Sequence, residues 1–173
     1  MFCVAQKKDS LDCGHIADTT KNALEGRVTI TIKSPIKIAD SSGREIFSIV
    51  LSKENRMLSG PMFYVHIVIH KGAACLDDDA PVTITFKNGK KEKFTSVANF
   101  NCKGEALIGL NGSFTNVKRY HDNAIYKLTV ETKTSHVEGT FSDENAQLFQ
   151  QYLNCLAKQT TVAKHWQTEK GDD

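Results

Sequence analysis

Two histidines four residues apart, His66 and His70, suggest a zinc site, because histidine nitrogens are common zinc ligands. The residues around them, FYVHIVIHK, alternate as a β-strand does. Residues four apart on a strand are separated by roughly 13 Å, whereas zinc–nitrogen bonds are about 2.0–2.1 Å long. One ion cannot bind both side chains. We therefore predict a face of mixed polar and apolar residues here and no metal site.

Two short charged segments raise the question of ion or nucleic-acid binding. Asp77, Asp78 and Asp79 follow one another, but calcium sites use oxygen ligands at alternating positions with a turn glycine, so we predict a solvated turn. The basic segment KNGKKEK at 87–93 lacks the interleaved aromatic residues that stack on bases. The formal net charge of the whole chain is only +2, so no nucleic-acid partner is expected.

The five cysteines are an odd number, and the first stretch of the chain bears on how they are used. Residues 1–5, MFCVA, resemble the last residues of an export signal, with Cys3 and Ala5 as the small residues before a cleavage point. Removal of this remnant would leave four cysteines with three possible pairings. The candidates for disulfide bonds are Cys13, Cys75, Cys102 and Cys155.

The sequence contains none of the short motifs that identify common catalytic sites. It has no Gly-x-Ser-x-Gly elbow, no phosphate-binding loop and no His-Glu-x-x-His pair. We therefore assign no catalytic, cofactor-binding or metal-binding residues and expect no cofactor.

The elements that would position these residues are mainly β-strands. In RVTITIK, the apolar residues Val28, Ile30 and Ile32 alternate with polar ones, which is the pattern of a half-buried strand. Strands of this kind are expected at 27–33, 36–38, 45–52, 62–71, 81–87, 91–100, 105–111, 124–133 and 135–141. About eight or nine strands at this spacing predict an antiparallel β-sandwich or barrel. The longest apolar run is strand-sized, so no membrane span is expected.

One helix is predicted at Ser142–Lys158, with Ser142 as its N-cap and two acidic residues in its first turn. Its apolar stripe, expected to pack on the sheet, consists of Leu148, Phe149, Tyr152, Leu153 and Leu156. The expected organisation is an irregular lead-in at 1–25, a single β-rich domain at 26–158 and a flexible tail at 159–173.

The hairpin around Asn88-Gly89 constrains the cysteine pairing. Of two possible registers, we favour the one that places Ile84 opposite Glu92 with Gly89 in the left-handed conformation, because it keeps Phe94 on the Ile84 face. This register brings Cys75 and Cys102 into neighbouring segments. Cys13 and Cys155 would then form the second pair and tie the lead-in to the end of the helix.

About half of the chain, Lys71 to Leu156, resembles a group of uncharacterised small exported proteins of Bacteroidetes-type bacteria. The shared features are the turn from Cys75 to Asp77, the Asn88-Gly89 hairpin, Asn101-Cys102-Lys103-Gly104, and a last helix ending in Cys155-Leu156. The resemblance implies export and carries no activity.

Together these observations predict a secreted or periplasmic protein that binds a partner or ligand without catalysis. Its expected location is therefore periplasmic or extracellular. The alternatives are a cell-envelope hydrolase with a site assembled from several strands, and a cytosolic protein with reduced thiols. A pocket with His66 or His70 beside Cys or Asp would favour the hydrolase, whereas an apolar patch without convergent ionisable groups would favour the binding protein.

Overall fold

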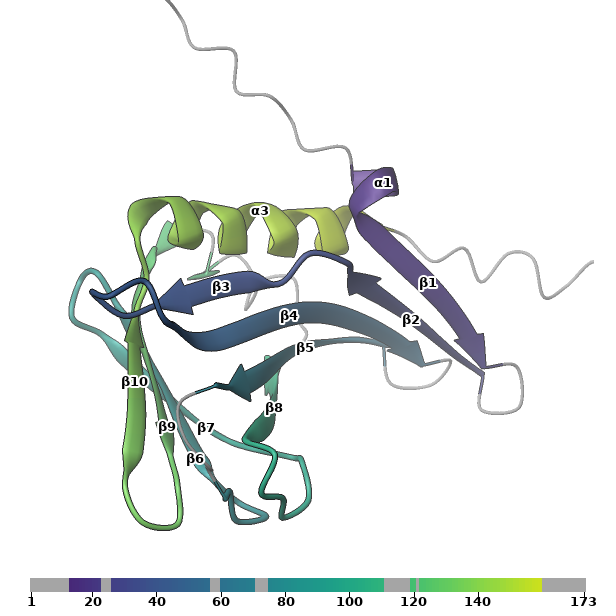
Figure 1. Ribbon diagram of the computed structural model, residues 1–173. Helices are drawn as coiled ribbons and strands as arrows, with labels where there is room; N and C mark the ends of the chain where they lie inside the picture. The colour runs from purple at the N-terminus through teal and green to yellow at the C-terminus, as the bar shows by residue number, and fades with distance from the viewer. Residues whose placement is uncertain are drawn as a thin grey trace, which may run out of the picture.

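The structure is a computed structural model, and it describes residues 13–22, 26–56, 60–70, 75–110, 119–120 and 122–159. The predicted export-signal remnant at 1–5 lies outside these residues, as does the predicted tail apart from Gln159. The described strands form two antiparallel sheets that pack as a β-sandwich, so the predicted fold class is confirmed in its sandwich form rather than as a closed barrel (Figure 1).

The first sheet has the strand order β1-β2-β4-β5-β8, and β3 pairs with β4 beside this path. Its strands are β1 (Ala17–Asn22), β2 (Arg27–Ile32), β3 (Ile36–Ala39), β4 (Glu45–Arg56), β5 (Gly60–Ile69) and β8 (Glu105–Leu110). The second sheet has the order β10-β9-β6-β7. Its strands are β6 (Pro81–Phe86), β7 (Lys91–Thr95), β9 (Ile125–Glu131) and β10 (His136–Thr140).

The period-two pattern of the sequence decides which side of each strand is buried. On β5, the predicted apolar face is confirmed, because its four members are buried while the residues between them, including His66, are only half-buried. These buried residues are Phe63, Val65, Ile67 and Ile69. The β6–β7 register also agrees with the prediction, with Ile84 opposite Glu92. Gly89 has φ +82°, the left-handed conformation that this hairpin requires.

The last helix, α3 (Asp143–Lys158), begins after Ser142, whose hydroxyl accepts a hydrogen bond from the Asn145 N–H at 3.1 Å. It lies along β3 and β4 and covers the core on that side (Figure 1). Phe149 is buried, and its ring packs edge-to-face against the ring of Phe141, with 6.3 Å between the two ring centres. In the described part of the chain, no helix has the length and apolar character needed to cross a membrane.

The predicted irregular lead-in at 1–25 is wrong for residues 13–22. They form a helical turn, α1 (Cys13–Ile16), and the edge strand β1. β1 lacks apolar alternation because its side chains are mostly exposed. It is held instead by the backbone ladder to β2 and by an ion pair of 3.0 Å between Asp18 and Lys33. A pattern of hydrophobicity cannot reveal a strand of this kind.

Strand β7 also differs from its prediction, since it ends at Thr95 rather than at residue 100. After it, the hydroxyl of Ser96 accepts hydrogen bonds from the N–H groups of Ala98 and Leu107, and the Val97 N–H donates to the Leu107 carbonyl. The chain therefore leaves the second sheet and turns toward β8 of the first.

Candidate functional site

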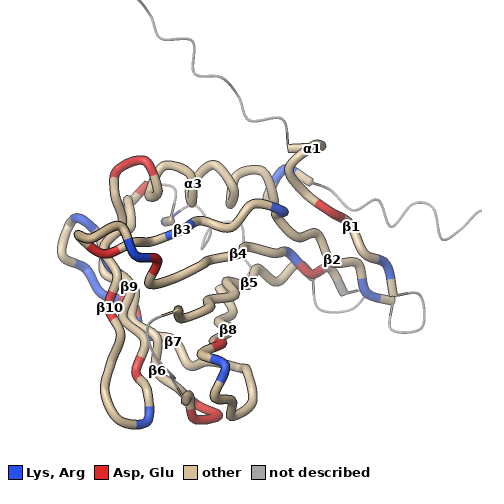
Figure 2. The backbone as a smooth tube through the Cα atoms, viewed as in Figure 1, with Lys and Arg blue, Asp and Glu red and all other residues tan. Residues whose placement is uncertain are grey.

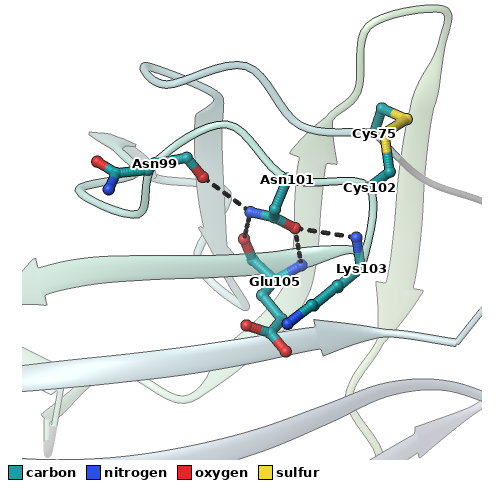
Figure 3. Close-up of a disulfide and its surroundings, with 6 residues drawn as sticks. All are labelled: Cys75, Asn99, Asn101, Cys102, Lys103 and Glu105. Carbon is teal, nitrogen blue, oxygen red and sulfur yellow. Dashed lines mark hydrogen bonds between the residues drawn. A yellow bond between two sulfur atoms is a disulfide. The ribbon is translucent and has the colours of Figure 1, made fainter.

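The segment between β7 and β8, residues 96–104, is here called the cystine loop because Cys102 forms a disulfide with Cys75 (Figure 3). This is the pair expected from the hairpin register. The loop is also joined to the preceding segment by a two-way backbone bridge. The Leu76 N–H donates to the Asn101 carbonyl at 2.8 Å, and the Asn101 N–H donates to the Leu76 carbonyl at 3.2 Å. Leu76 is itself buried in the core, so the loop is anchored to the body of the sandwich.

Asn101 fixes the second half of the loop through its side-chain amide (Figure 3). The amide NH2 group donates to the carbonyl oxygens of Asn99 at 3.0 Å and Glu105 at 2.9 Å. The amide oxygen accepts from the N–H groups of Lys103 at 3.2 Å and Glu105 at 3.0 Å. All four hydrogen-bonding positions of the amide are thus used within the loop and the start of β8.

The same loop holds large apolar side chains out in solvent. Val97 is 61% exposed and Phe100 is 53% exposed. Among the described residues, the other large hydrophobic side chain with comparable exposure is Tyr126, which lies at the start of β9. The ammonium group of Lys133 lies 5.7 Å from the centre of the Phe100 ring, close enough for a cation–π interaction.

An acidic turn of three exposed residues, Asp77–Asp79, lies beside the cystine loop. The carboxylate of Asp78 accepts a hydrogen bond from the Phe100 N–H, so this turn also fixes the backbone that carries the exposed ring. Figure 2 shows the turn as a continuous red segment next to β6. In the described part of the chain, no group of three or more His, Cys, Asp or Glu side chains could hold a metal ion.

A second polar cluster lies in the first sheet at the start of β4. It consists of Glu45, Ser48 and His70. The hydroxyl of Ser48 donates to the Glu45 carboxylate, and the His70 Nε2 atom lies 2.9 Å from Ser48 Oγ and 3.1 Å from Glu45 Oε1. The Ser48 hydroxyl, followed by Lys37 at 3.2 Å, lowers the pKa of the Glu45 carboxyl.

The proton arrangement of this cluster differs from that of a nucleophilic serine. A serine hydroxyl has one hydrogen, and here Ser48 uses it on Glu45, so the contact with His70 requires the hydrogen to be on Nε2. A nucleophilic serine instead donates to an unprotonated histidine nitrogen, while the acid contacts the other ring nitrogen. His70 directly follows β5, whereas the other histidine of the pair, His66, lies within β5, between Val50 of β4 and Leu107 of β8.

The second disulfide joins Cys13 of α1 to Cys155 of α3, which is also the expected pair. Gln159, the residue after α3, strengthens this junction because its side-chain amide donates to the Cys13 carbonyl at 3.1 Å. Two intramolecular disulfides are typical of proteins in an oxidising environment, either extracellular or periplasmic.

Comparisons with protein-family models, curated proteins and solved structures found no match for this chain. The geometry of the cystine loop is therefore the main basis for a functional proposal. The sequence contained one signal for this loop, since an asparagine and a glycine flank a cysteine in Asn101-Cys102-Lys103-Gly104. It gave no sign that Val97 and Phe100 would be exposed.

Proposed function

We propose that the protein acts in an extracellular or periplasmic compartment as a non-catalytic binding protein, and that it docks a protein partner through the cystine loop. The observation that supports this proposal is the combination of a rigidly held backbone with exposed apolar side chains. Val97 and Phe100 stand in solvent on a loop that is fixed by a disulfide, a backbone bridge and the side chains of Asn101 and Asp78.

Exposed apolar side chains on a rigid loop favour binding for an energetic reason. Ordering a flexible side chain or loop on association costs free energy, so a loop that is already ordered keeps more of the interaction energy for affinity. Aromatic residues are also frequent among the few residues that dominate binding free energy. Phe100 satisfies both conditions, and we expect it to be the main anchor.

The charges around the loop define the kind of partner that fits. The acidic turn Asp77–Asp79 lies next to Phe100, and all three of its side chains are exposed. A complementary partner therefore has an apolar pocket for Phe100 with basic side chains along the rim that faces this turn, and none against Lys133, whose ammonium group lies over the Phe100 ring. Such rim charges contribute mainly to the association rate and its dependence on salt.

Site-specific photo-crosslinking tests the proposal directly. A photoreactive phenylalanine analogue at position 100 should crosslink one defined protein in intact cell envelopes of the source organism. The matched control carries the same analogue at position 126, the exposed tyrosine on β9, and should not crosslink that protein. Equal crosslinking from both positions would argue against a specific docking loop.

The partner identified in this way should then be purified and its affinity measured. Phe100→Ala should weaken binding at least tenfold, while Tyr126→Ala should leave it unchanged. Replacing Asp77 and Asp79 with asparagine should slow association and reduce its salt dependence, and Asp78 is left intact because it fixes the loop. A Phe100→Ala variant that binds as tightly as the wild type would contradict the proposal.

A cell-envelope hydrolase is the second candidate, since Ser48 Oγ and His70 Nε2 lie within hydrogen-bonding distance. The hydrogen bond from Ser48 to Glu45 argues against it. A fluorophosphonate probe, which labels nucleophilic serines, distinguishes the two functions. We expect no labelling of Ser48, and labelling that is lost in Ser48→Ala would favour the hydrolase.

A further inference from the structure

The cysteine residues of the two disulfides differ in how exposed they are to solvent. Cys102 is exposed and its partner Cys75 is half-buried. In the other bond, Cys13 is half-buried and Cys155 is only 3% exposed, on the core-facing side of α3, so neither cysteine is as exposed as Cys102. Figure 3 shows the Cys75–Cys102 bond pointing away from the side chain of Asn101 and its hydrogen bonds.

Exposure decides which sulfur an external thiol can attack. Thiol–disulfide exchange begins with a thiolate that approaches one sulfur of the bond and displaces the other. In the Cys75–Cys102 bond, the accessible end is Cys102, so Cys75 is the leaving group. One cation, Lys133, lies near this bond, with its ammonium group beside Phe100, and partly offsets the negative charge of the Asp77–Asp79 turn. The side chain of Lys103 points away from the disulfide, toward Glu105 (Figure 3).

The contacts around this disulfide would keep both cysteines in place after the bond opens. The backbone bridge between Leu76 and Asn101 does not involve either sulfur. The Lys133 N–H donates to the Cys75 carbonyl at 3.1 Å and holds the backbone of the leaving residue. Asn101 holds the backbone on either side of Cys102. Opening this bond therefore does not require the sandwich to unfold.

We propose that Cys102 is a thiol-exchange site at which a small external thiol becomes covalently attached while the fold is retained. The thiolate attacks the Sγ atom of Cys102, a new sulfur–sulfur bond forms, and the Cys75–Cys102 bond breaks. Cys75 leaves as a thiolate and takes a proton from solvent. The reverse step, in which Cys75 attacks the mixed disulfide, expels the small thiol and restores the original bond. This reaction goes beyond partner docking and needs no partner.

The test uses the purified, oxidised protein and 2-mercaptoethanol, an uncharged monothiol, at mildly alkaline pH. Samples are quenched with acid at intervals, free thiols are alkylated, and peptides are analysed by mass spectrometry. The expected product has mercaptoethanol on Cys102, an alkyl group on Cys75 and an intact Cys13–Cys155 bond. It should form at least tenfold faster than any product of Cys13–Cys155, and circular dichroism of the adduct should remain that of the folded protein.

Three results would overturn the proposal: an adduct mainly on Cys75, equal reaction rates for both disulfides, or loss of the folded spectrum as the adduct forms. A Lys133→Glu variant provides a second measurement that depends on the site itself, because Lys133 lies beside Cys75 and Phe100. With anionic glutathione as the attacking thiol, the added negative charge should slow adduct formation severalfold, whereas the rate with uncharged mercaptoethanol should change less. Equal slowing with both thiols would count against attack at Cys102. None of these measurements depends on a docking partner, so their failure would leave the proposed function separately testable.

Discussion

Asn101 shows how a single amide can determine the shape of a loop. Its side chain forms four hydrogen bonds, each to a backbone group of the cystine loop or of Glu105 at the start of β8. A hydrogen bond contributes about 0.5–1.5 kcal/mol to folding, and a buried backbone group left without a partner costs more. Loop conformation here thus depends on one side chain as well as on the disulfide.

Replacing Asn101 with alanine should therefore lower the free energy of unfolding by about 2–4 kcal/mol, measured by urea denaturation. The matched control is Asn99→Ala, because the Asn99 side chain is exposed and points away from Asn101 (Figure 3). Its cost should stay within about 0.5 kcal/mol, as for ordinary surface changes. If the two variants were equally stable, Asn101 would not be what fixes the loop.

The hydrogen bonds of Asp40 make the stability of a surface turn depend on pH. Its carboxylate accepts hydrogen bonds from the hydroxyl and N–H of Ser42 and from the N–H of Arg44. These bonds, the one from the Ser42 hydroxyl foremost, lower the pKa of Asp40 from its ordinary 3.8 to about 2. Because the folded pKa is below the unfolded value, the stabilisation is fully present above about pH 4 and is lost as pH falls toward 2.

Two measurements check this assignment. An NMR titration should show the pKa of the Asp40 carboxyl rising toward its ordinary value in Ser42→Ala. In urea denaturation, the wild type should be more stable than Asp40→Asn at pH 6, and the difference should disappear near pH 2. An Asp40 carboxyl that titrates at its ordinary value in the wild type would show that these hydrogen bonds do not form in solution.

At the scale of elements, the contact between β10 and β3 depends on the absence of a side chain at Gly139. A Cβ atom there would lie 2.6 Å from Cδ2 of Phe47 and 2.9 Å from Cγ2 of Ile38, and both of these residues are fully buried. Neither can move without disturbing the core between the two sheets. The close approach of the sheets at this edge therefore requires glycine.

Gly139→Ala should lower the free energy of unfolding by about 1–3 kcal/mol, as overpacking of a core does. Gly109→Ala on β8 is the matched control, since its Cβ atom would meet Met62 and Tyr64 at 3.8 Å, an ordinary contact distance. That variant should be as stable as the wild type or slightly more stable in thermal denaturation. A neutral Gly139→Ala would mean that β10 and β3 separate more easily than their packing suggests.

Most strands were predictable from sequence because their burial follows a period of two, as on β5, where every second residue is buried. The exceptions have physical reasons. β1 buries little, so it leaves no hydrophobic pattern. β4 continues to Arg56, past the predicted end at residue 52. Its Lys53 breaks the apolar pattern but is buried, and its ammonium group donates to the Gln159 carbonyl after α3 at 2.8 Å. Burial also lowers the pKa of this lysine.

The candidate site was less predictable than the fold. The cysteine pair could be found because the Asn88-Gly89 hairpin sets the register of the segments around it. The exposure of Phe100 could not, because extending the alternation of β7 places this residue on the buried face. The strand stops at Thr95 because the next residue, Ser96, accepts a hydrogen bond from Leu107 of β8. This is a long-range contact that no local sequence pattern encodes.

At the scale of the whole molecule, the two disulfides should contribute unequally to stability. Cys13 and Cys155 are 142 residues apart in sequence, whereas Cys75 and Cys102 are 27 apart. Loop entropy gives about 5 kcal/mol for the longer closure and about 3–4 kcal/mol for the shorter one. The double variant Cys13→Ser/Cys155→Ser should therefore melt at a lower temperature than Cys75→Ser/Cys102→Ser in thermal denaturation. The opposite order would show that chain entropy is not the main contribution of these bonds.

The Cys13–Cys155 bond has a mechanical consequence as well. It joins the first described helix to the last one, and the whole sandwich lies in the chain between them. If the protein is pulled by its two ends, the tension passes from Cys13 to Cys155 through the sulfur–sulfur bond. The strands and the cystine loop then carry no load, so stretching alone would not pull the sandwich apart until this bond is cut.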